Sequence, residues 1–392
     1  MRYYIIAGEA SGDLHGSNLM KGLYHEDPQA DIRFWGGEMM DAVYRSNQDG
    51  KGLVRDYKEG AVIGFSQIFL HARKFLRRFS DCCADILAWK PDVVILIDYP
   101  GFNFRVAQFA HQHGFKVFYY IAPKVWASRE SRIRKLKEYV DRLFIVFPFE
   151  KAYFDKKGVR YIYRGNPLID AVDGSPSTAL SREAFFRTAS LPDAPYVAIL
   201  AGSRKGEIAS MMPVCTAFAE KMLDLPAYAS WHFVIAGAPS RNPEDYAPYL
   251  TGRLQERMHV VFGQTYAVIR HARAAVVNSG TASLETCLLG TPQVVAYAGT
   301  PFNFNVGKHI IRVDFISLGN LILGRKAFRE LLQYYFTPEN VLSEVRRLVE
   351  DGPYREKMLE DYALIRQELG GAGASAAVAA SMTACLRNPD NN

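Results

Sequence analysis

The sequence lacks the features that would place it in several large classes of protein. Its five cysteines form no C-x-x-C pair, so we expect no structural zinc site. The same cysteine usage predicts a protein of a reducing compartment. The net charge is +6, but no long run of Lys and Arg is present, and nucleic acid is therefore not an expected partner. No apolar run approaches the ~18 residues of a membrane-spanning helix. Residues 1–8 resemble a first strand and are too short for a signal peptide, which predicts a cytoplasmic protein.

Two motifs of nucleotide-dependent enzymes are also absent. The first predicted turn carries Gly8 and Gly12, four positions apart, so the G-x-G-x-x-G dinucleotide fingerprint is missing. Its absence argues against a nicotinamide-dependent oxidoreductase. No D-x-D pair occurs, so we expect no metal ion and no cofactor, and protein groups would have to stabilise a departing diphosphate.

The length and the order of predicted elements favour two domains. A chain of 392 residues is too long for one ordinary core, and 49% hydrophobic and 22% charged residues are typical of a globular protein. Short apolar strands alternate with helices in both halves, which predicts an α/β fold of two Rossmann-like, doubly wound parallel-sheet domains facing a cleft. We predict domains at residues 1–172 and 173–352, and a helical tail at 353–392 that packs on the first domain or on a partner subunit.

The stretch 274–299 contains the clearest candidate site. A buried strand ending at Val277 runs into a turn of small residues, 278–283, followed by a helix that carries Glu285 and ends at Gly290. We expect Ser and Thr side chains to cap the helix start. Backbone N–H groups and the positive end of the helix dipole converge there, so an anion can bind, and Glu285 can accept two ribose hydroxyls. An ordinary capped helix is the alternative reading of this stretch.

Two further strand ends present reactive groups. Asp98 follows a continuous apolar strand that starts at residue 92, the pattern of a buried parallel strand, whose carboxyl end is where ligands of such folds gather. Arg204 lies in a second small-residue turn and can donate two hydrogen bonds to a phosphate. The residues alone also allow simpler roles, with Asp98 as a helix cap, His15 as a packing residue and Glu207 as a cap of the helix after the Arg204 turn.

Nine segments carry a resemblance to one enzyme family. In order and spacing they resemble lipid-A-disaccharide synthases, from residue 1 to about 335, and they read GEASGDLHGSNLM, LIDYPGFNFR, APKVWASRESRI, FPFE, RGNPLIDA, AGSRKGEI, VIAGAPS, GQTY and NSGTASLE. The resemblance implies an inverting glycosyltransferase of the two-Rossmann (GT-B) type. The family transfers 2,3-diacylglucosamine from UDP-2,3-diacylglucosamine to the 6-hydroxyl of 2,3-diacylglucosamine 1-phosphate. The products are the β-1,6-linked disaccharide and UDP, in the lipopolysaccharide biosynthesis of Gram-negative bacteria.

The same resemblance implies roles for individual residues. The catalytic residues it implies are Asp98 as general base, His15 and Arg204. The substrate-binding residues it implies are Glu9, Ser11, Asp13 and Asn103 for the acceptor and Ser203, Gln264, Ser279, Gly280, Thr281 and Glu285 for the UDP-sugar. Ser128-Arg129 depart from the family pattern, where Trp-Lys is expected, which leaves the contact of residues 126–129 open. Whether the chain acts as a monomer or a homodimer is also left open.

Residues 62–79 are the expected membrane contact. Apolar residues recur there at helical spacing and alternate with basic ones, and both substrates carry acyl chains. We expect Phe65, Ile68 and Phe69 to touch an anionic membrane surface, while the helix from Phe75 and Phe79 onward packs on the sheet. The enzyme would then be peripherally associated with the inner membrane.

Two alternatives remain from the sequence. A UDP-N-acetylglucosamine 2-epimerase would share the nucleotide-binding half but would need no lipid surface. A non-catalytic nucleotide-sugar or lipid-binding protein would bind UDP without turning anything over. Release of UDP with and without an acylated acceptor would separate these alternatives from a transferase.

Overall fold

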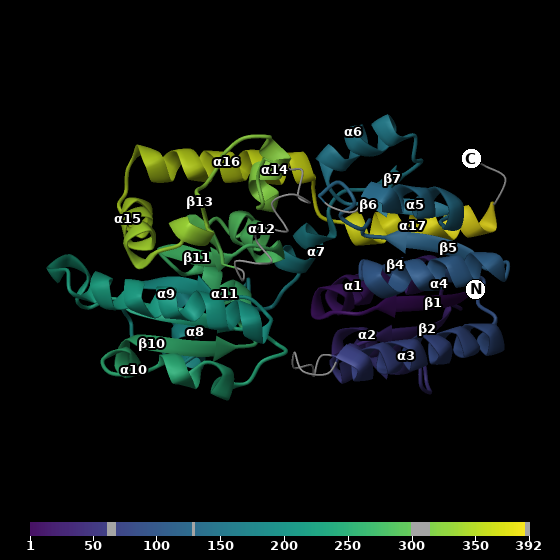
Figure 1. Ribbon diagram of the computed structural model, residues 1–392, viewed down its shortest axis with the longest axis horizontal. Coiled ribbons are helices and arrows are strands. Elements are labelled where there is room, and N and C mark those ends of the chain that lie inside the picture. The colour runs from purple at the N-terminus through teal and green to yellow at the C-terminus, as the bar shows by residue number, and fades with distance from the viewer. Residues whose placement is uncertain (61–67, 128–129, 299–313, 389–392) are drawn as a thin grey trace. The chain divides into compact units, whose positions relative to one another are not determined.

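The computed structural model describes residues 1–60, 68–127, 130–298 and 314–388. The chain divides into two compact units, Met1–Ala171 with Gly371–Asn392, and Val172–Gly370. Each unit is built around one parallel sheet flanked by helices (Figure 1). The prediction of two doubly wound parallel-sheet domains is therefore confirmed. The C-terminal segment is shared between the units, with helix α16 (Pro353–Leu369) in the second and helix α17 (Ala374–Arg387) in the first.

The first sheet has seven strands in the order β3-β2-β1-β4-β5-β6-β7, all parallel. The central strand β4 reads Val-Val-Ile-Leu-Ile and every residue is buried, as expected for a parallel strand covered on both faces. The strands are β1 (Arg2–Ala7), β2 (Asp31–Gly36), β3 (Leu53–Asp56), β4 (Val93–Ile97), β5 (Lys116–Tyr120), β6 (Arg142–Ile145) and β7 (Ile162–Tyr163). The strand order reverses between β1 and β4, and the loops that follow these two strands lie beside each other there.

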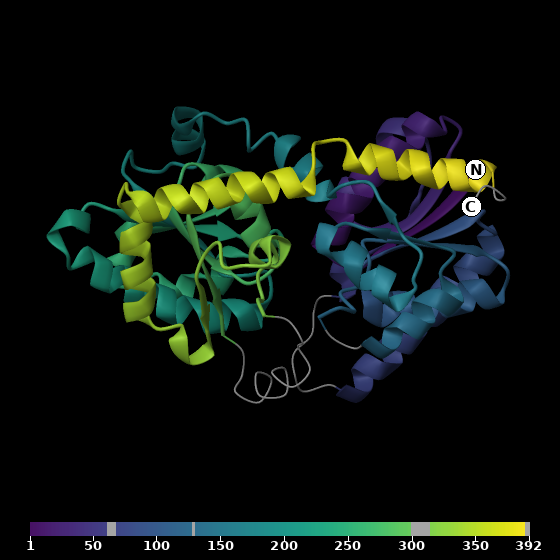
Figure 2. The same cartoon turned by 90° about the horizontal axis from the view of Figure 1, so that it is seen from above.

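Helices cover both faces of the first sheet. The helices are α1 (Ala10–Glu26), α2 (Glu38–Asn47), α3 (Ile68–Trp89), α4 (Pro100–Gln112), α5 (Ile133–Tyr139), α6 (Pro148–Lys157) and α7 (Pro167–Asp173). Helix α4 packs against α3 and α5, whereas α1 packs against α2 and α17 (Figure 2). The approach of α1 to α17 requires a glycine, because a Cβ added to Gly22 would lie only 2.7 Å from the Cβ of Ala379.

The second sheet repeats the doubly wound plan, with the order β10-β9-β8-β11-β12-β13 and all neighbours parallel. Its strands are β8 (Tyr196–Leu200), β9 (His232–Gly237), β10 (Met258–Phe262), β11 (Ala274–Asn278), β12 (Gln293–Tyr297) and β13 (Glu330–Leu332). Its other helices are α8 (Arg182–Thr188), α9 (Lys205–Leu223), α10 (Leu254–Arg257), α11 (Thr265–Arg270), α12 (Thr281–Leu288), α14 (Leu318–Leu323) and α15 (Pro338–Val349). The strand order of this sheet reverses between β8 and β11.

Several elements differ from the sequence-based expectation. Strands β3 and β13 were not predicted, because they are short edge strands without a continuous apolar run. Residues 353–387 form two helices because Gly370 and Gly373 interrupt them with φ angles of +91° and +101°.

The segment Pro353–Arg387 is long and apolar enough, by length and composition alone, to be a candidate membrane span. Its 18-residue apolar window has a mean hydropathy of 1.4, and 39% of that window is buried. Inspection of apolar runs in the sequence did not anticipate this candidate. In the structure α17 packs along α1, and Val378, Ala379 and Met382 of α17 are buried within the first unit. We therefore assign the segment to the fold and not to a membrane span.

Candidate functional site

Two of the acceptor-side residues expected from the sequence, Glu9 and Asp98, lie at the point where the strand order of the first sheet reverses. In open α/β sheets this point, at the carboxyl ends of the strands, forms the usual ligand crevice. The loop after β1 carries Gly8 and Glu9, and the loop after β4 carries Asp98 and Tyr99. The loops touch each other, because a Cβ on Gly8 would collide with the Tyr99 ring. Only glycine fits at this contact.

The surroundings of Asp98 change the proton affinity of its carboxyl. Its side chain is half-buried, and burial raises the pKa of its carboxyl above the ordinary value. The ammonium group of Lys124 lowers that pKa and the Glu9 carboxylate raises it, so groups after β1, β4 and β5 act on one another. A carboxylate with a raised pKa accepts a proton more readily at neutral pH than an ordinary exposed one.

The other expected acceptor residues have different surroundings. Glu9 and Ser11 are exposed at the start of α1. Asp13 is buried, and its carboxylate accepts hydrogen bonds from three backbone N–H groups at the start of α2, at 2.8–3.1 Å. His15 is buried on α1, and burial lowers its pKa to about 4, an effect that Asp170 opposes. His15 is therefore neutral at pH 7, and the Asp13 carboxylate links α1 to α2.

Two further charged residues at this edge of the first sheet, Lys124 and Glu150, were not singled out from the sequence. Lys124 lies just after β5, at the same edge of the sheet, and its position after a buried strand is the signal that could have identified it. Glu150 is buried in the first turn of α6 and accepts hydrogen bonds from Trp126 Nε1 at 3.0 Å and from the N–H groups of residues 146 and 147. Burial raises the pKa of Glu150 to about 7. Glu150 therefore holds Trp126, whose substrate contact the sequence left open.

The two turns expected to bind anions in the second unit differ in whether a side chain of the protein already accepts their N–H groups. In the turn after β8, the Glu207 carboxylate accepts the N–H groups of Ser203 at 2.9 Å and of Arg204 at 3.2 Å. The Arg204 guanidinium pairs with the same carboxylate at 3.1 Å. A side chain of the protein thus occupies the position expected for a phosphate. The simpler role considered for Glu207, a helix cap, is confirmed.

In the turn after β11, no side chain of the described residues takes the corresponding place. Gly280 is the N-cap residue of α12, and the expected capping by Ser and Thr is wrong, because the described residues provide no side-chain cap hydrogen bond there. The Ser283 hydroxyl donates to the Gly280 carbonyl and the Ser279 hydroxyl donates to the Ile316 carbonyl at 3.5 Å, so both serine side chains are engaged elsewhere. The N–H groups of the first turn of α12 and the helix dipole can therefore take an anion.

The two turns are neighbours in space. Gly202 has a φ of +99°. A Cβ on Gly202 would lie 2.6 Å from the side-chain nitrogen (Nδ2) of Asn278, which is the last residue of β11. The Ser240 hydroxyl, after β9, donates to the Ser203 carbonyl at 3.4 Å. Residues after β8, β9 and β11 therefore converge at the point where the strand order of the second sheet reverses, as two acceptor-side residues do in the first sheet.

The remaining donor-side candidates flank these turns. Glu285 is half-buried on α12 and accepts a hydrogen bond from the Tyr266 hydroxyl at 2.9 Å, which fixes its carboxylate. Burial raises the pKa of Glu285, and the Tyr266 hydrogen bond opposes the rise. The Gln264 side-chain oxygen accepts a hydrogen bond from Thr188 at 3.3 Å. Among the described residues no group of three or more His, Cys, Asp or Glu side chains could hold a metal ion.

The expected membrane contact is described only in part. Phe65 lies outside the described residues, as do the side chains of Ile68 and Phe69 in the first turn of α3. Farther along α3, the rings of Phe75 and Phe79 pack edge-on against the core, which confirms the prediction for this part of the helix. The same part of α3 exposes a set of side chains to solvent, namely Arg73, Lys74, Leu76 and Arg77.

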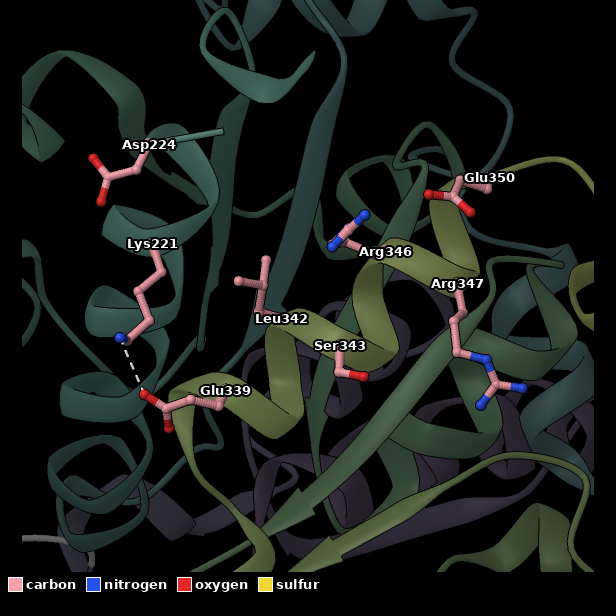
Figure 3. Close-up of a pocket in the computed structure, with 8 residues that line it drawn as sticks. All are labelled: Lys221, Asp224, Glu339, Leu342, Ser343, Arg346, Arg347 and Glu350. Carbon is pink, nitrogen blue, oxygen red and sulfur yellow. Dashed lines mark ion pairs between the residues drawn. The ribbon is translucent and has the colours of Figure 1, made fainter. Parts of the chain in front are cut away.

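A groove of about 520 Å³ lies elsewhere in the second unit, between α9 and α15 (Figure 3). An ion pair between Lys221 and Glu339, 3.1 Å apart, spans it. Its lining combines three acidic side chains, one leucine and one serine with three basic side chains. No residue expected at the catalytic or substrate-binding sites is among them. This groove therefore does not coincide with the site expected from the sequence.

The comparisons with known proteins agree with the sequence motifs. The model of the Lipid-A-disaccharide synthetase family matches residues 3–381. A lipid-A-disaccharide synthase from Geobacter metallireducens is 38% identical over 378 residues, which cover 96% of this chain and 95% of the relative. The likeness therefore extends through both units and is not confined to the nucleotide-binding half.

Solved structures with the same fold include transferases and epimerases. A UDP-GlcNAc 2-epimerase from Methanocaldococcus jannaschii, in complex with UDP-GlcNAc and UDP, has a TM-score of 0.65 at 12% identity and covers 98% of this chain and 100% of its own. The calicheamicin glycosyltransferase CalG4 has a TM-score of 0.57 at 16% identity, covering 100% and 99%. At such identities the likeness concerns the fold alone, so the epimerase alternative has no support beyond the fold.

Proposed function

This chain belongs to the lipid-A-disaccharide synthase family, and from that premise we propose which of its residues carry out the transfer. The protein is a glycosyltransferase of lipid A biosynthesis. Its reaction joins UDP-2,3-diacylglucosamine to 2,3-diacylglucosamine 1-phosphate and releases UDP. The substrates follow from the family, and the roles below follow from the surroundings of each residue.

Asp98 is the general base of the proposal. In an inverting displacement the acceptor 6-hydroxyl attacks the anomeric carbon as the bond to UDP breaks, so one base must take the hydroxyl proton. Asp98 lies where the first sheet reverses direction, with a carboxyl whose pKa is raised by burial and with Lys124 and Glu9 nearby. This environment is the observation that carries the assignment.

The test is disaccharide formation from the two acylated glucosamine substrates. Asp98→Asn should lower kcat by about 10²–10⁴-fold and leave UDP binding nearly unchanged, because the base acts only on the acceptor. Asp92→Asn is the matched control, since Asp92 precedes the same strand and accepts the N–H of Arg2 at 2.7 Å. More than about a tenth of wild-type kcat in the Asp98 variant would assign the base to another residue.

The donor diphosphate is proposed to bind at the start of α12, beside Ser279, Gly280 and Thr281. The support is the uncapped first turn of that helix, in contrast to the α9 turn, where Glu207 occupies the N–H groups. Arg204 comes from the adjacent loop and would stabilise the charge that builds on the leaving UDP. Glu285, oriented by Tyr266, would accept the ribose hydroxyls.

Two variants separate these donor roles. Arg204→Ala should lower kcat and weaken UDP binding, because its contact strengthens as charge accumulates on the diphosphate. Glu285→Gln should act mainly on donor KM, because ribose contacts change little during the reaction. Glu220→Gln, an equal charge change in the last turn of α9, is the control. An unaltered donor KM in the Glu285 variant would contradict the ribose assignment.

We also propose peripheral association with the inner membrane through α3 and the residues before it. The exposed cations Arg73, Lys74 and Arg77 would each gain about 1 kcal/mol near anionic headgroups. The double variant Arg73→Glu/Arg77→Glu should lose flotation with anionic liposomes, whereas Arg187→Glu/Arg346→Glu, an equal charge change in the second unit, should keep it. Equal flotation of both double variants would refute the role of α3. Sedimentation of the same proteins distinguishes a monomer from the homodimer.

A further inference from the structure

The backbone at Asp98 is unusual because two consecutive residues adopt left-handed conformations. Asp98 has a φ of +42°, and Tyr99 follows with a φ of +45° and a ψ of +53°. Residues other than glycine rarely occupy this region, and two in succession persist only where surrounding contacts enforce them. The direction in which the Asp98 side chain leaves the strand depends on this turn.

Three hydrogen bonds to the backbone of Asp98 enforce the turn. The Asp98 N–H donates to the Tyr120 carbonyl at 3.2 Å. The Asp98 carbonyl accepts two hydrogen bonds, from the Tyr119 hydroxyl at 2.7 Å and from the side-chain amide of Asn103 at 2.8 Å. The donors come from β5 and α4, and both side chains are fully buried. The carbonyl is therefore held from two different elements.

We propose that Tyr119 and Asn103 are positioning residues that fix the direction of the Asp98 carboxylate through its backbone carbonyl. The inference rests on the proposed role of Asp98 as base. A base must lie within hydrogen-bond reach of the proton it accepts, and an error of about 1 Å in its position can lower the rate about 10²-fold. Asn103, expected from the family to bind substrate, acts here on the backbone of the base.

Neither contact is explained by ordinary core packing. A phenylalanine would fill the space of the Tyr119 ring, which packs against Phe104 with ring centroids 5.6 Å apart. The Tyr119 hydroxyl remains a neutral donor at physiological pH, because burial raises its pKa well above the ordinary value. Asn103 also donates to the carbonyl of Ile97 at 3.2 Å, so it spans the last residue of β4 and the first residue of the turn.

The experiment compares two tyrosines that are adjacent in one strand. Tyr119→Phe removes one hydroxyl and should lower kcat by about 10–100-fold without changing donor KM. Tyr120→Phe is the matched control, since Tyr120 is as fully buried, the substitution keeps the backbone carbonyl that accepts the Asp98 N–H, and the hydroxyl it removes makes no hydrogen bond to Asp98 among the described residues. It should stay within about twofold of wild type.

A double-mutant cycle tests whether Tyr119 acts through Asp98. In the Asp98→Asn background, Tyr119→Phe should have almost no further effect on residual turnover, because the carboxylate it positions is already lost. A full additional loss would mean that Tyr119 supports the enzyme in another way and would overturn the proposal. So would a Tyr119→Phe variant with the kcat of the Tyr120→Phe control.

A second route covers the case in which Tyr119→Phe does not fold. Asn103→Ala removes the other donor to the same carbonyl and should show the same loss of kcat, and the same lack of effect in the Asp98→Asn background. Wild-type kcat in a folded Asn103→Ala variant would overturn the proposal. If Asp98→Asn itself remains active, the assignment of the base has failed. If only the Tyr119 and Asn103 variants remain active, the base stands and the positioning role has failed.

Discussion

Replacing Glu207 by glutamine should strengthen UDP binding. The Glu207 carboxylate occupies the N–H groups of Ser203 and Arg204 and pairs with the Arg204 guanidinium, as a phosphate would. A diphosphate bound at the neighbouring start of α12 would meet this negative charge. Glutamine keeps an oxygen that can accept the two N–H groups, so the substitution removes the charge and preserves much of the loop.

The size of the effect follows from Coulomb's law. Two unit charges about 6 Å apart repel by about 0.7–2.8 kcal/mol for effective dielectric constants of about 80 down to 20. The Glu207 side chain is 27% exposed, so solvent and salt reduce the repulsion, and about 1 kcal/mol is a reasonable net value. This corresponds to about fivefold tighter UDP binding. The loss of the exposed ion pair with Arg204 should destabilise the fold by less than about 1 kcal/mol.

Isothermal titration with UDP measures the effect directly. Glu220→Gln is the control, because Glu220 lies on the same helix and pairs with Arg253 away from the turn. The gain in the Glu207 variant should shrink as salt is raised, whereas the control should bind UDP as the wild type does. Unchanged or weaker UDP binding in the Glu207 variant would refute the idea that its carboxylate competes with the donor, and would leave it a purely structural cap.

Three further predictions concern pH and backbone geometry. Lys124→Ala should move the acidic limb of the kcat/KM profile to higher pH, because Lys124 holds the pKa of Asp98 down. The pKa of Glu150 rises from 4.5 to about 7 on folding, so its stabilising contribution is complete below pH 4.5 and is lost as the pH rises through about 7. Urea unfolding of Glu150→Gln should therefore show a weaker fall in stability over that range. Gly202→Ala should lose about 1–3 kcal/mol of stability, because φ is +99°, whereas Gly206→Ala, with open space around it, should not.

The strand ends could be predicted from the sequence because buried parallel strands leave a simple pattern. Continuous apolar runs such as Val93–Ile97 and Ala274–Asn278 have few alternatives, and the polar residues that follow them must lie at the carboxyl edge of a sheet. Asp98 was found in this way. The apolar runs do not reveal the order of the strands in the sheet. That order brings the loop after β8 beside the loop after β11.

The partners of polar residues were harder to predict than their positions. Asp13 and Asn103 were expected to bind substrate, yet their side chains hydrogen-bond to backbone groups, in the case of Asp13 to groups 24–27 residues away. No sequence spacing encodes such contacts. Glu207 is the opposite case, because a residue three positions after Arg204 at a helix start is a known capping position and the contact is local.

The groups found where the strand order reverses have opposite charge in the two sheets, and this division suits the proposed reaction. The first unit places the carboxylates of Asp98 and Glu9 at the point where its strand order reverses, and the ammonium group of Lys124 acts on Asp98 there. The second unit places backbone N–H groups and Arg204 at the corresponding point of its own sheet. Proton removal from an acceptor hydroxyl needs an anion, whereas departure of UDP needs groups that stabilise negative charge. A carboxylate directly beside the diphosphate would repel it, and an arginine directly beside the base would lower the pKa of that base. Because the two sets of groups follow strands of different sheets, each keeps the local charge that its proposed step requires.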